Sequence, residues 1–213
     1  MLSPQIFARR QQPTRAASLS PTVWNPADYS STVDVISGGG LTLTASVGGS
    51  GGARSTNPLA AGSAYFEITV NTNNSNAGFS GIAKATIPPD QITNNPSNNT
   101  AGLGVYWSGP IFGVGGSGNL GAFANGNVLC VAVNLSSRLA WFRKNAGLWN
   151  NSGTADPATS TGGLSYSGMS TFTVYPFTGT GGGGDSSTLN AGASAFAQTM
   201  PSGFSSWNAL NGV

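Results

Sequence analysis

The chain has 213 residues, of which 38% are hydrophobic, and this is enough to build one large domain around a buried core. Only 7% of the residues are charged, whereas an ordinary domain carries about 25%. Ser, Thr, Asn and Gly must therefore cover most of the surface, and no stretch approaches the roughly 18 apolar residues that a membrane-spanning helix needs. This composition disfavours helix and favours strands joined by turns, so we expect an all-β domain without a membrane span.

The residue types also exclude the commonest catalytic and metal chemistry. The sequence has no histidine, which removes Ser-His-Asp and Cys-His catalysis in their ordinary forms, together with the usual zinc sites. Glu67 is the only glutamate, and most aspartates stand beside Pro, Gly or Ser, where a role in a turn explains them better than a catalytic pair. Cys130, the single cysteine, lies inside an apolar run and is interpreted as a small buried hydrophobic residue. We therefore expect a protein that is not an enzyme and that holds neither a metal nor a cofactor.

The first 23 residues differ from the rest of the chain in charge. Arg9, Arg10 and Arg15 lie in a stretch without any acid, and prolines at positions 4, 13 and 21 oppose a long helix. The apolar run of a secretory signal peptide is absent from this stretch. We expect an extended basic arm over residues 1–23 that orders against a neighbouring protein, with an organellar transit peptide as the alternative. Residues 24–213 carry five basic and six acidic side chains, and this balance argues against a nucleic-acid surface on the folded domain.

The β domain is expected to begin near Trp24, with a turn at residues 25–26. Residues 48–57 are expected to form a Gly/Ser loop that carries Arg54. Residues 88–100 are expected to form a polar loop, because three prolines in it oppose regular structure. Alternation of apolar and polar residues, or a short apolar run, predicts strands over residues 33–36, 41–44, 63–70, 78–83, 103–107, 111–114, 171–176 and 187–191.

The centre of the chain is a predicted β-hairpin over residues 126–145, which read GNVLCVAVNLSSRLAWFRKN. Two apolar runs of strand length, 128–135 and 139–142, are separated by a short polar connection. The first run is apolar on both of its alternating faces, with Leu129, Val131 and Val133 on one face and Val128, Cys130 and Ala132 on the other. A strand of this kind is covered on both sides, so we place the hairpin at the middle of a β-sandwich.

This hairpin resembles the signature hairpin of SPRY domains, in which a Gly-Asp-Val-Ile-Gly start leads through a hydrophobic strand and a turn to an aromatic pair and a Lys-Asn-Gly turn. Two departures are Asn127, which stands where the pattern has an acid, and Ala146, which is inserted before the turn glycine. Three other segments also resemble the family and occur in its order along the chain. SAYFEITV (63–70) and GFSGIA (78–83) precede the hairpin, and the closing PSGFSSW (201–207) comes after it. Trp149 and the run DPATSTGG (156–163) resemble a segment that follows the hairpin in SPRY-like proteins of bacteriophages. The resemblance spans about residues 60–207.

The resemblance implies a single all-β, two-sheet antiparallel sandwich of the concanavalin-like SPRY type over residues 24–213, behind the N-terminal arm. It also implies a binding module, and the phage-type segment implies a place in a bacteriophage virion. On this interpretation the protein is a multicopy capsid decoration, head fibre or tail adhesin. The arm, with Arg9, Arg10 and Arg15, anchors it to other virion proteins, and the loops of the sandwich bind a host-surface glycan or protein. Two other functions remain open: a free peptide-binding adaptor of the cellular SPRY kind and, with less support, a glycan-cleaving enzyme.

Aromatic residues in polar loops are the candidate binding residues. A ring beside amide and hydroxyl groups suits the stacking of a sugar face, and Trp and Tyr also anchor protein interfaces. A role in the core is the competing interpretation for each ring. The positions that flank the matched motifs, and that we expect to contact a ligand, are Tyr106, Trp107, Arg143, Trp149 and Asp156.

Overall fold

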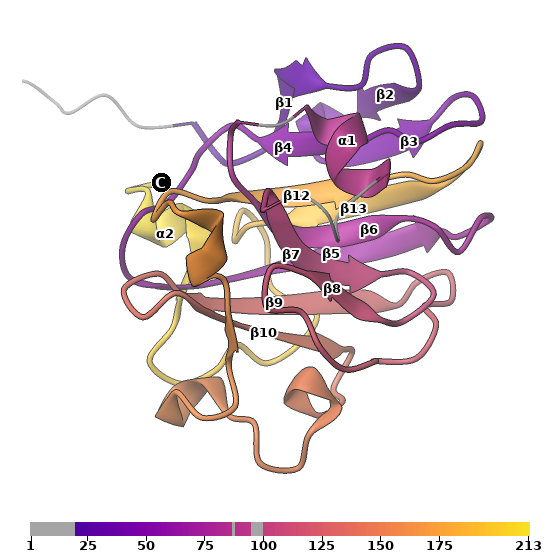
Figure 1. Cartoon of the computed structure of the whole chain (residues 1–213). Coiled ribbons are helices and arrows are strands. Elements are labelled where there is room, and N and C mark those ends of the chain that lie inside the picture. The colour runs from indigo at the N-terminus through magenta and orange to yellow at the C-terminus, as the bar shows by residue number, and fades with distance from the viewer. Residues whose placement is uncertain (1–19, 87, 95–99) are drawn as a thin grey trace, which may run out of the picture.

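Two β-sheets face each other across one hydrophobic core (Figure 1). The structure is a computed structural model that describes residues 20–86, 88–94 and 100–213. Arg9, Arg10 and Arg15 lie outside the described residues, so the role of the arm stays a prediction. Thr22 is buried, and its backbone N–H donates to the Asn208 side-chain oxygen at 3.0 Å. The packed part of the chain therefore includes residues that the sequence assigned to the arm.

Almost all neighbouring strands run antiparallel, and this confirms the predicted two-sheet sandwich. The first sheet has six strands in the order β1 (Trp24–Tyr29), β4 (Ala53–Ser55), β12 (Tyr175–Gly179), β6 (Phe79–Ala83), β7 (Gly102–Tyr106) and β8 (Ile111–Gly113). The second sheet follows the order β11 (Leu164–Ser165), β10 (Leu139–Lys144), β9 (Val128–Asn134), β5 (Ser63–Thr72), β13 (Ser186–Asn190), β3 (Thr42–Ala45) and β2 (Asp34–Ser37). The short strand β14 (Ser205–Ser206) pairs in parallel with β5.

The predicted central hairpin is confirmed as β9 and β10, with Trp141 opposite Ala132. Strand β9 lies between β10 and β5, and both of its faces are buried as the sequence indicated. One face belongs to the core between the sheets, through Leu129, Val131 and Val133. The other face belongs to a second apolar cluster on the outer side of the sheet, which contains Val128, Cys130, Ala132, Tyr65, Trp141 and Phe204.

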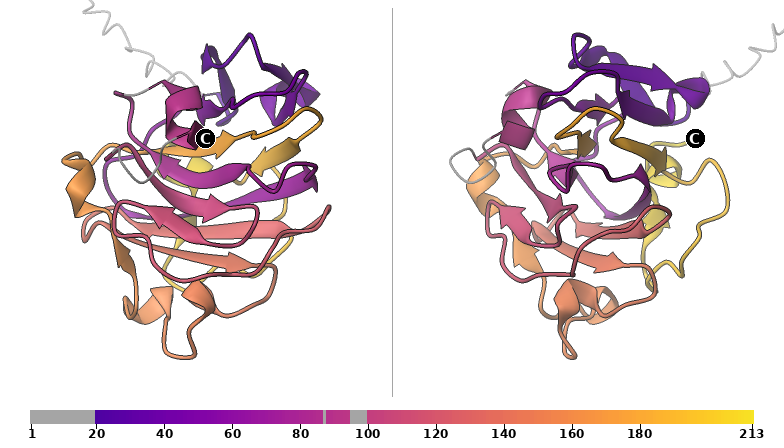
Figure 2. Two further views of the ribbon diagram at one scale, coloured as in Figure 1. Left: turned by 45° about the vertical axis from the view of Figure 1, so that its right-hand side comes forward. Right: turned by 90° about the vertical axis from the view of Figure 1, so that its right-hand side faces the viewer.

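A segment near the C-terminus, residues 191–204, covers this second cluster, and we call it the C-terminal strap (Figure 2). The strap has no regular secondary structure of its own. Its position therefore depends on contacts with side chains of the second sheet. The buried carboxylate of Glu67 accepts the backbone N–H groups of Ala197 and Gln198 at 2.8 Å each. The ring of Phe196 packs edge-on against Tyr65, with ring centroids 4.7 Å apart. The strap then leads through β14 to the short helix α2 (Trp207–Leu210).

The core between the sheets also contains a chain of polar side chains. The indole Nε1 of Trp107 donates to Ser80 Oγ at 3.0 Å, and Ser80 shares a hydrogen bond of 2.8 Å with Thr178. Thr178 then shares a hydrogen bond of 2.9 Å with Ser187 of β13. Because buried hydroxyl groups are costly when they lack partners, this chain satisfies four side chains and links the two sheets.

The structure corrects the expected loop at residues 88–100, because the helix α1 occupies Pro89–Asn94. A proline is well tolerated in the first turn of a helix, where its missing N–H would have no partner and its fixed φ is already helical. Prolines that were expected to prevent helix therefore stand at its start. The helix packs on the outer face of the first sheet, where Ile92 joins a cluster with Phe79, Ala83, Ala101 and Phe177.

Three further expectations need correction. Residues 53–55 of the expected Gly/Ser loop form β4, so Arg54 lies on a strand. The strand expected at 171–176 begins only at Tyr175 and runs to Gly179. The expected turn at residues 25–26 lies inside β1, where the register shifts between Trp24 and Tyr29. Strand β1 is at the edge of its sheet, and an edge strand with an irregular register accommodates Pro26.

The remaining elements are single turns of 3₁₀ helix, η1 (Gly38–Gly40), η2 (Trp149–Asn151), η3 (Pro157–Thr159) and η4 (Ser167–Met169). Within the described ranges, none of the helices has the length and apolar content to cross a bilayer.

Candidate functional site

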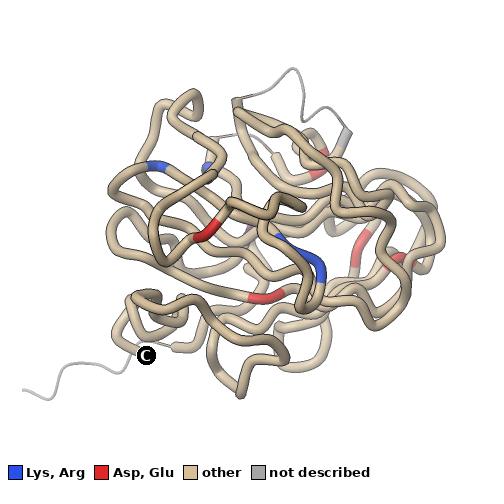
Figure 3. Tube along the Cα trace, turned by 90° about the horizontal axis from the view of Figure 1, so that it is seen from below, with Lys and Arg blue, Asp and Glu red and all other residues tan. Residues whose placement is uncertain are grey.

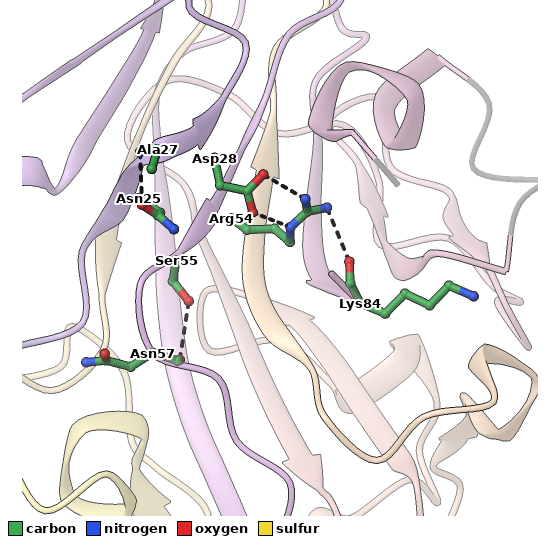
Figure 4. Close-up of polar contacts among 7 residues, drawn as sticks. All are labelled: Asn25, Ala27, Asp28, Arg54, Ser55, Asn57 and Lys84. Carbon is green, nitrogen blue, oxygen red and sulfur yellow. Dashed lines mark hydrogen bonds and ion pairs between the residues drawn. The ribbon is translucent and has the colours of Figure 1, made fainter. Parts of the chain in front are cut away.

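A buried arginine fixes the edge of the first sheet (Figure 4). Arg54 on β4 is buried, with 3% of the whole residue exposed. Its Nε and Nη2 donate to the two carboxylate oxygens of Asp28 on β1, at 2.7 Å each, and its Nη1 donates to the carbonyl oxygen of Lys84 at 3.2 Å. A bidentate, charge-assisted pair has a defined geometry as well as favourable energy. Arg54 therefore holds β1 at a fixed distance from the end of β6.

Beside this ion pair the surface has a pocket of about 320 Å³. The turn between β1 and β2 forms one wall, and the segment that begins α1 forms another. The residues that line the pocket are Tyr29, Ser30, Ser31, Thr32, Val33, Ser50, Pro88, Pro89 and Asp90. A volume near 300 Å³ is at the lower end of the range for small-ligand pockets, so the pocket is of a size for one or two small rings.

Backbone hydrogen bonds hold the wall between β1 and β2. The N–H of Ser30 donates to the carbonyl oxygen of Gly52 at 2.9 Å. The N–H groups of Val33 and Asp34 both donate to the carbonyl oxygen of Ser30, at 2.9 and 2.8 Å. With its backbone groups paired in this way, the turn does not need a ligand to keep its shape.

The opposite wall is held through α1. Thr93 Oγ1 donates to the carbonyl oxygen of Gly51 at 2.9 Å, and Ile92 is completely buried against the first sheet. These two contacts fix the first turn of the helix, which carries Asp90 to the pocket. The pocket is thus assembled from segments 60 residues apart in sequence, with both walls anchored on the sandwich.

The lining residues offer hydroxyl groups and one carboxylate. Five of the nine carry a hydroxyl, Asp90 carries the only charge, and none of the nine is His, Cys, Lys or Arg. Ser30 Oγ is buried and has no hydrogen-bond partner within the described residues. A hydroxyl both donates and accepts hydrogen bonds, and the rings of Pro88, Pro89 and Tyr29 add apolar faces. This set suits a polar, uncharged ligand with hydroxyl groups of its own.

Asp34 follows the pocket's turn and lies beneath it in the core. Its side chain is 1% exposed, Oδ1 accepts a hydrogen bond of 2.7 Å from Thr180 Oγ1, and Oδ2 has no partner among the described residues. Burial raises the pKa of this carboxyl above its usual range, and the nearby carboxylate of Asp185 raises the pKa further. Hydrogen bonds from Thr180 and Gly52 lower the pKa, but burial has the larger effect. Asp185 itself accepts bonds from Asn74, Ser75, Gly181 and Gly182, so its carboxylate organises two turns.

The structure places Tyr106 and Trp107 at the end of β7, on the first sheet. Trp107 is 1% exposed and donates into the polar chain of the core, so its ring offers no face to a ligand. Tyr106 is half-buried, with its ring 5.2 Å from that of Phe79 and 5.7 Å from that of Phe112. Neither residue lines the pocket.

Arg143 and Trp149 lie together on the outer side of the second sheet. The guanidinium carbon of Arg143 lies 4.4 Å from the centre of the Trp149 ring, and Nη2 donates to the Thr199 carbonyl oxygen of the strap. Asp156 caps η3, because its Oδ1 accepts the backbone N–H of Ala158 at 2.9 Å. The structure therefore brings together only two of the five candidate residues, Arg143 and Trp149, by direct contact.

The segment formed by Trp149 and residues 156–163 lies as a folded loop against β10. The Trp141 indole donates to the Thr161 carbonyl oxygen at 2.7 Å. Asn150 accepts the backbone N–H of Phe142 at 2.9 Å and donates to the Gly162 carbonyl oxygen at 2.8 Å. These contacts give the segment a structural role in covering the edge of the second sheet.

The sequence did not single out the pocket residues as a site. Tyr29, Ser30, Ser50 and Asp90 occur in stretches that look like ordinary polar turns. The run of hydroxyl residues at 29–32 and the proline pair at 88–89 lie far apart in the sequence, so no local pattern links them. No group of three or more metal-ligating side chains occurs within residues 20–86, 88–94 and 100–213.

Comparison with known proteins identifies the fold. No family model matches the chain, and no curated protein matches it in sequence. Among solved structures, the chain is similar to the SPRY domain of human HERC1, with a TM-score of 0.62 and 13% sequence identity. The match covers 81% of this chain and 99% of that domain. At this identity the likeness shows the fold alone, and it bears out the fold that the hairpin and its flanking motifs implied: the chain has a SPRY-type, concanavalin-like β-sandwich fold.

Proposed function

We propose that this protein is a non-enzymatic binding module of a bacteriophage virion, whose pocket between β1–β2 and α1 binds a neutral glycan of the host surface. The observation that carries the binding proposal is the pocket itself, with five hydroxyl side chains, one carboxylate and three apolar rings on two anchored walls. The hydroxyls can each give and receive hydrogen bonds with sugar hydroxyls, and the rings can cover the apolar face of a sugar.

The virion part of the proposal rests on the sequence. Trp149 and residues 156–163 resemble a segment of phage SPRY-like proteins, and the arm at 1–23 carries Arg9, Arg10 and Arg15 without an acid. In the proposal the arm binds an acidic surface of another virion protein, and many copies project their sandwiches outward. The low content of charged residues, 7%, suits a protein that stays packed in a particle.

A free peptide-binding adaptor is the second candidate, and Asp90 favours it. As the only charged lining residue, Asp90 can pair with a cationic group of a peptide. A glycan-cleaving enzyme has less support, because hydrolysis of this kind normally uses two carboxyl groups and the pocket is lined by one.

The binding proposal is tested on an array of neutral and charged glycans with the full-length protein. The variant Thr32→Arg places a long cationic side chain in the pocket wall, and Thr154→Arg makes the same change at an exposed position in the loop after η2. We expect wild type and Thr154→Arg to bind the same neutral glycans, and Thr32→Arg to bind them about tenfold more weakly or not at all. Equal binding by all three forms contradicts the pocket as the site. If the protein binds no glycan but binds a basic peptide, and Thr32→Arg abolishes the peptide binding, the peptide-binding adaptor is favoured.

The virion proposal is tested separately by immunogold labelling of purified particles with antibody against residues 24–213. Label on the capsid or the tail supports it and tells the two locations apart, whereas unlabelled particles refute it. Particles assembled with a chain that lacks residues 1–23 test the anchor, and normal incorporation of that chain contradicts the proposed role of the arm.

A further inference from the structure

Arg138 occupies a backbone conformation that long side chains rarely adopt. It lies in the turn between β9 and β10 with φ of 55°, in the left-handed region. Six other non-glycine residues of the described chain have positive φ, and all six are Asn or Ser, the short polar residues that tolerate this region or bond to the nearby backbone. Glycine, Asn or Ser would therefore suit the turn better than Arg138. The turn alone does not explain this side chain.

The side chain of Arg138 lies on an exposed phenylalanine. Its guanidinium carbon is 3.5 Å from the centre of the Phe172 ring, and Nη1 makes a weak hydrogen bond of 3.5 Å to the Ser167 carbonyl oxygen. Phe172 is 51% exposed, although Val174, two residues further along the chain, is fully buried. A cation on one face of the ring holds both groups in place, so the surface carries an ordered guanidinium and an ordered apolar ring side by side.

Lys84 adds a second cation at the same place. Its Nζ donates to the Met169 carbonyl oxygen at 3.4 Å and to Thr100 Oγ1 at 3.0 Å. Lys84 and Arg138 thus both donate to carbonyl groups of η4, the turn Ser167–Met169. Strand β12 begins three residues after Phe172, and its first residue, Tyr175, pairs with Ala83, the residue before Lys84. Both cations therefore lie close to the segment that carries Phe172.

Neither cation is neutralised by an acid within the described residues, where the recorded ion pair is Arg54 with Asp28. Charged positions are few and scattered along the chain, as Figure 3 shows. Two cations that share one turn without a carboxylate leave a local positive potential, which attracts an anionic partner over several ångströms of water. Arg and Phe are also enriched in protein–protein interfaces.

We propose that Arg138, Lys84 and Phe172 form a docking site for an acidic segment of a partner protein. A carboxylate of the segment replaces the weak carbonyl contacts of Arg138 and Lys84, and an apolar side chain next to it covers the exposed part of the Phe172 ring. The enrichment of Arg and Phe in protein–protein interfaces favours a peptide with acidic and apolar residues as the occupant over an acidic sugar. The site uses none of the residues of the pocket, so it is independent of the proposed glycan binding.

The turn conformation provides a variant that separates binding from stability. Arg138→Gly removes the guanidinium and places the residue best suited to positive φ in the turn. We expect its melting temperature to equal or exceed that of the wild type while binding of the acidic segment is lost. Phe172→Ser and Lys84→Gln remove the other two members. Lys144→Gln is the control, because it removes one cation on β10 that bonds instead to the Ala122 carbonyl oxygen.

The experiment selects binders from a random-peptide library displayed on yeast with the wild-type protein, and removes those that also bind Arg138→Gly. We expect the surviving peptides to be rich in Asp and Glu beside an apolar residue. They should bind Arg138→Gly and Phe172→Ser about tenfold more weakly than wild type, the size expected for one charge-assisted contact, and Lys144→Gln equally well. Rising salt should weaken the binding. Lys84→Gln should show a smaller loss in the same direction.

Several results overturn the proposal. They are the absence of any Arg138-dependent peptide, enrichment of peptides without an excess of acids, and equal binding by Phe172→Ser. The proposal is also overturned if no Arg138-dependent peptide is found and the protein instead binds sialylated or uronate glycans through Arg138. That result would assign the surface to an acidic sugar. The glycan result for Thr32→Arg does not bear on any of these outcomes.

Discussion

Arg54 and Asp28 join β4 to β1 through two parallel hydrogen bonds of 2.7 Å, and the two side chains differ sharply in exposure. The Arg54 side chain is 4% exposed and the Asp28 side chain is 29% exposed. A buried charge that loses its partner is far more costly than one that can turn to water, so the two ends of this pair should respond differently to mutation.

We predict that Asp28→Asn destabilises the protein more than Arg54→Met. The first change removes the countercharge of a buried guanidinium, at a cost of about 3 kcal/mol. The second leaves a carboxylate that can reach solvent, so only the charge-assisted hydrogen bonds are lost, at a cost of about 1–2 kcal/mol. Urea unfolding of both variants measures the difference, with Lys144→Met as a control for the loss of one cation. A larger loss for Arg54→Met would contradict the prediction.

The buried carboxyl of Asp34 predicts a pH dependence. Its pKa in the folded protein is raised by burial, while in the unfolded chain it is near the ordinary value of about 3.9. The folded state then holds the proton more tightly, so the stabilising effect of this group is complete below the unfolded pKa and is lost as pH rises through the folded pKa. We expect Asp34→Asn to gain stability relative to wild type as pH rises above the unfolded pKa of about 3.9, measured by the urea midpoint.

The control for this series is Asp90→Asn, which changes a carboxylate at the surface of the pocket. A pH-dependent gain confined to Asp34→Asn assigns the effect to the buried carboxyl. A constant difference between Asp34→Asn and wild type at every pH would show that Asp34 carries the same charge in the folded and unfolded states.

Glu67 holds the C-terminal strap, and its removal should loosen the strap without unfolding the sandwich. Glu67→Ala leaves the N–H groups of Ala197 and Gln198 without their acceptor, which should cost about 1–3 kcal/mol. We expect faster hydrogen exchange in residues 191–204 and faster reaction of Cys130 with a thiol reagent, because the strap covers the cluster that contains this cysteine. Asn71→Ala, a change at an exposed position of the same strand, should leave both rates unchanged.

Gly81 lies opposite Gly104 in the pairing of β6 and β7, and this close approach predicts a strong effect of alanine. A Cβ at Gly81 would overlap the carbonyl oxygen of Leu103 and the Cα of Gly104. We expect Gly81→Ala to destabilise the protein by about 1–3 kcal/mol, as overpacking does. Gly153→Ala is the matched control, because a Cβ there meets nothing within 4 Å, and its melting temperature should stay near that of wild type. Equal melting temperatures for the two variants would show that β6 and β7 can separate without cost.

The sequence predicted the sheets well because strands have local signatures. The run 128–135 showed that both faces of β9 are buried, and the structure places it between β10 and β5 in the second sheet. The alternation in residues 63–70 likewise predicted β5, although the strand continues to Thr72. The same local rules failed at α1, because prolines mark both loops and first turns of helices. They failed again at β4, where the short run Ala53–Ser55 is too brief to show a period.

The candidate site shows the limit of the sequence more clearly. Sequence patterns alone determined the all-β composition, the central hairpin and the absence of histidine chemistry, since these depend on residue types and on spacings within one segment. Only the tertiary structure decided that Trp107 is in the core, that Arg54 pairs with Asp28, and that the turn after Tyr29 meets Asp90 to form a pocket. Those contacts join segments that lie far apart along the chain, and the packing of the two sheets, rather than any local period, brings them together.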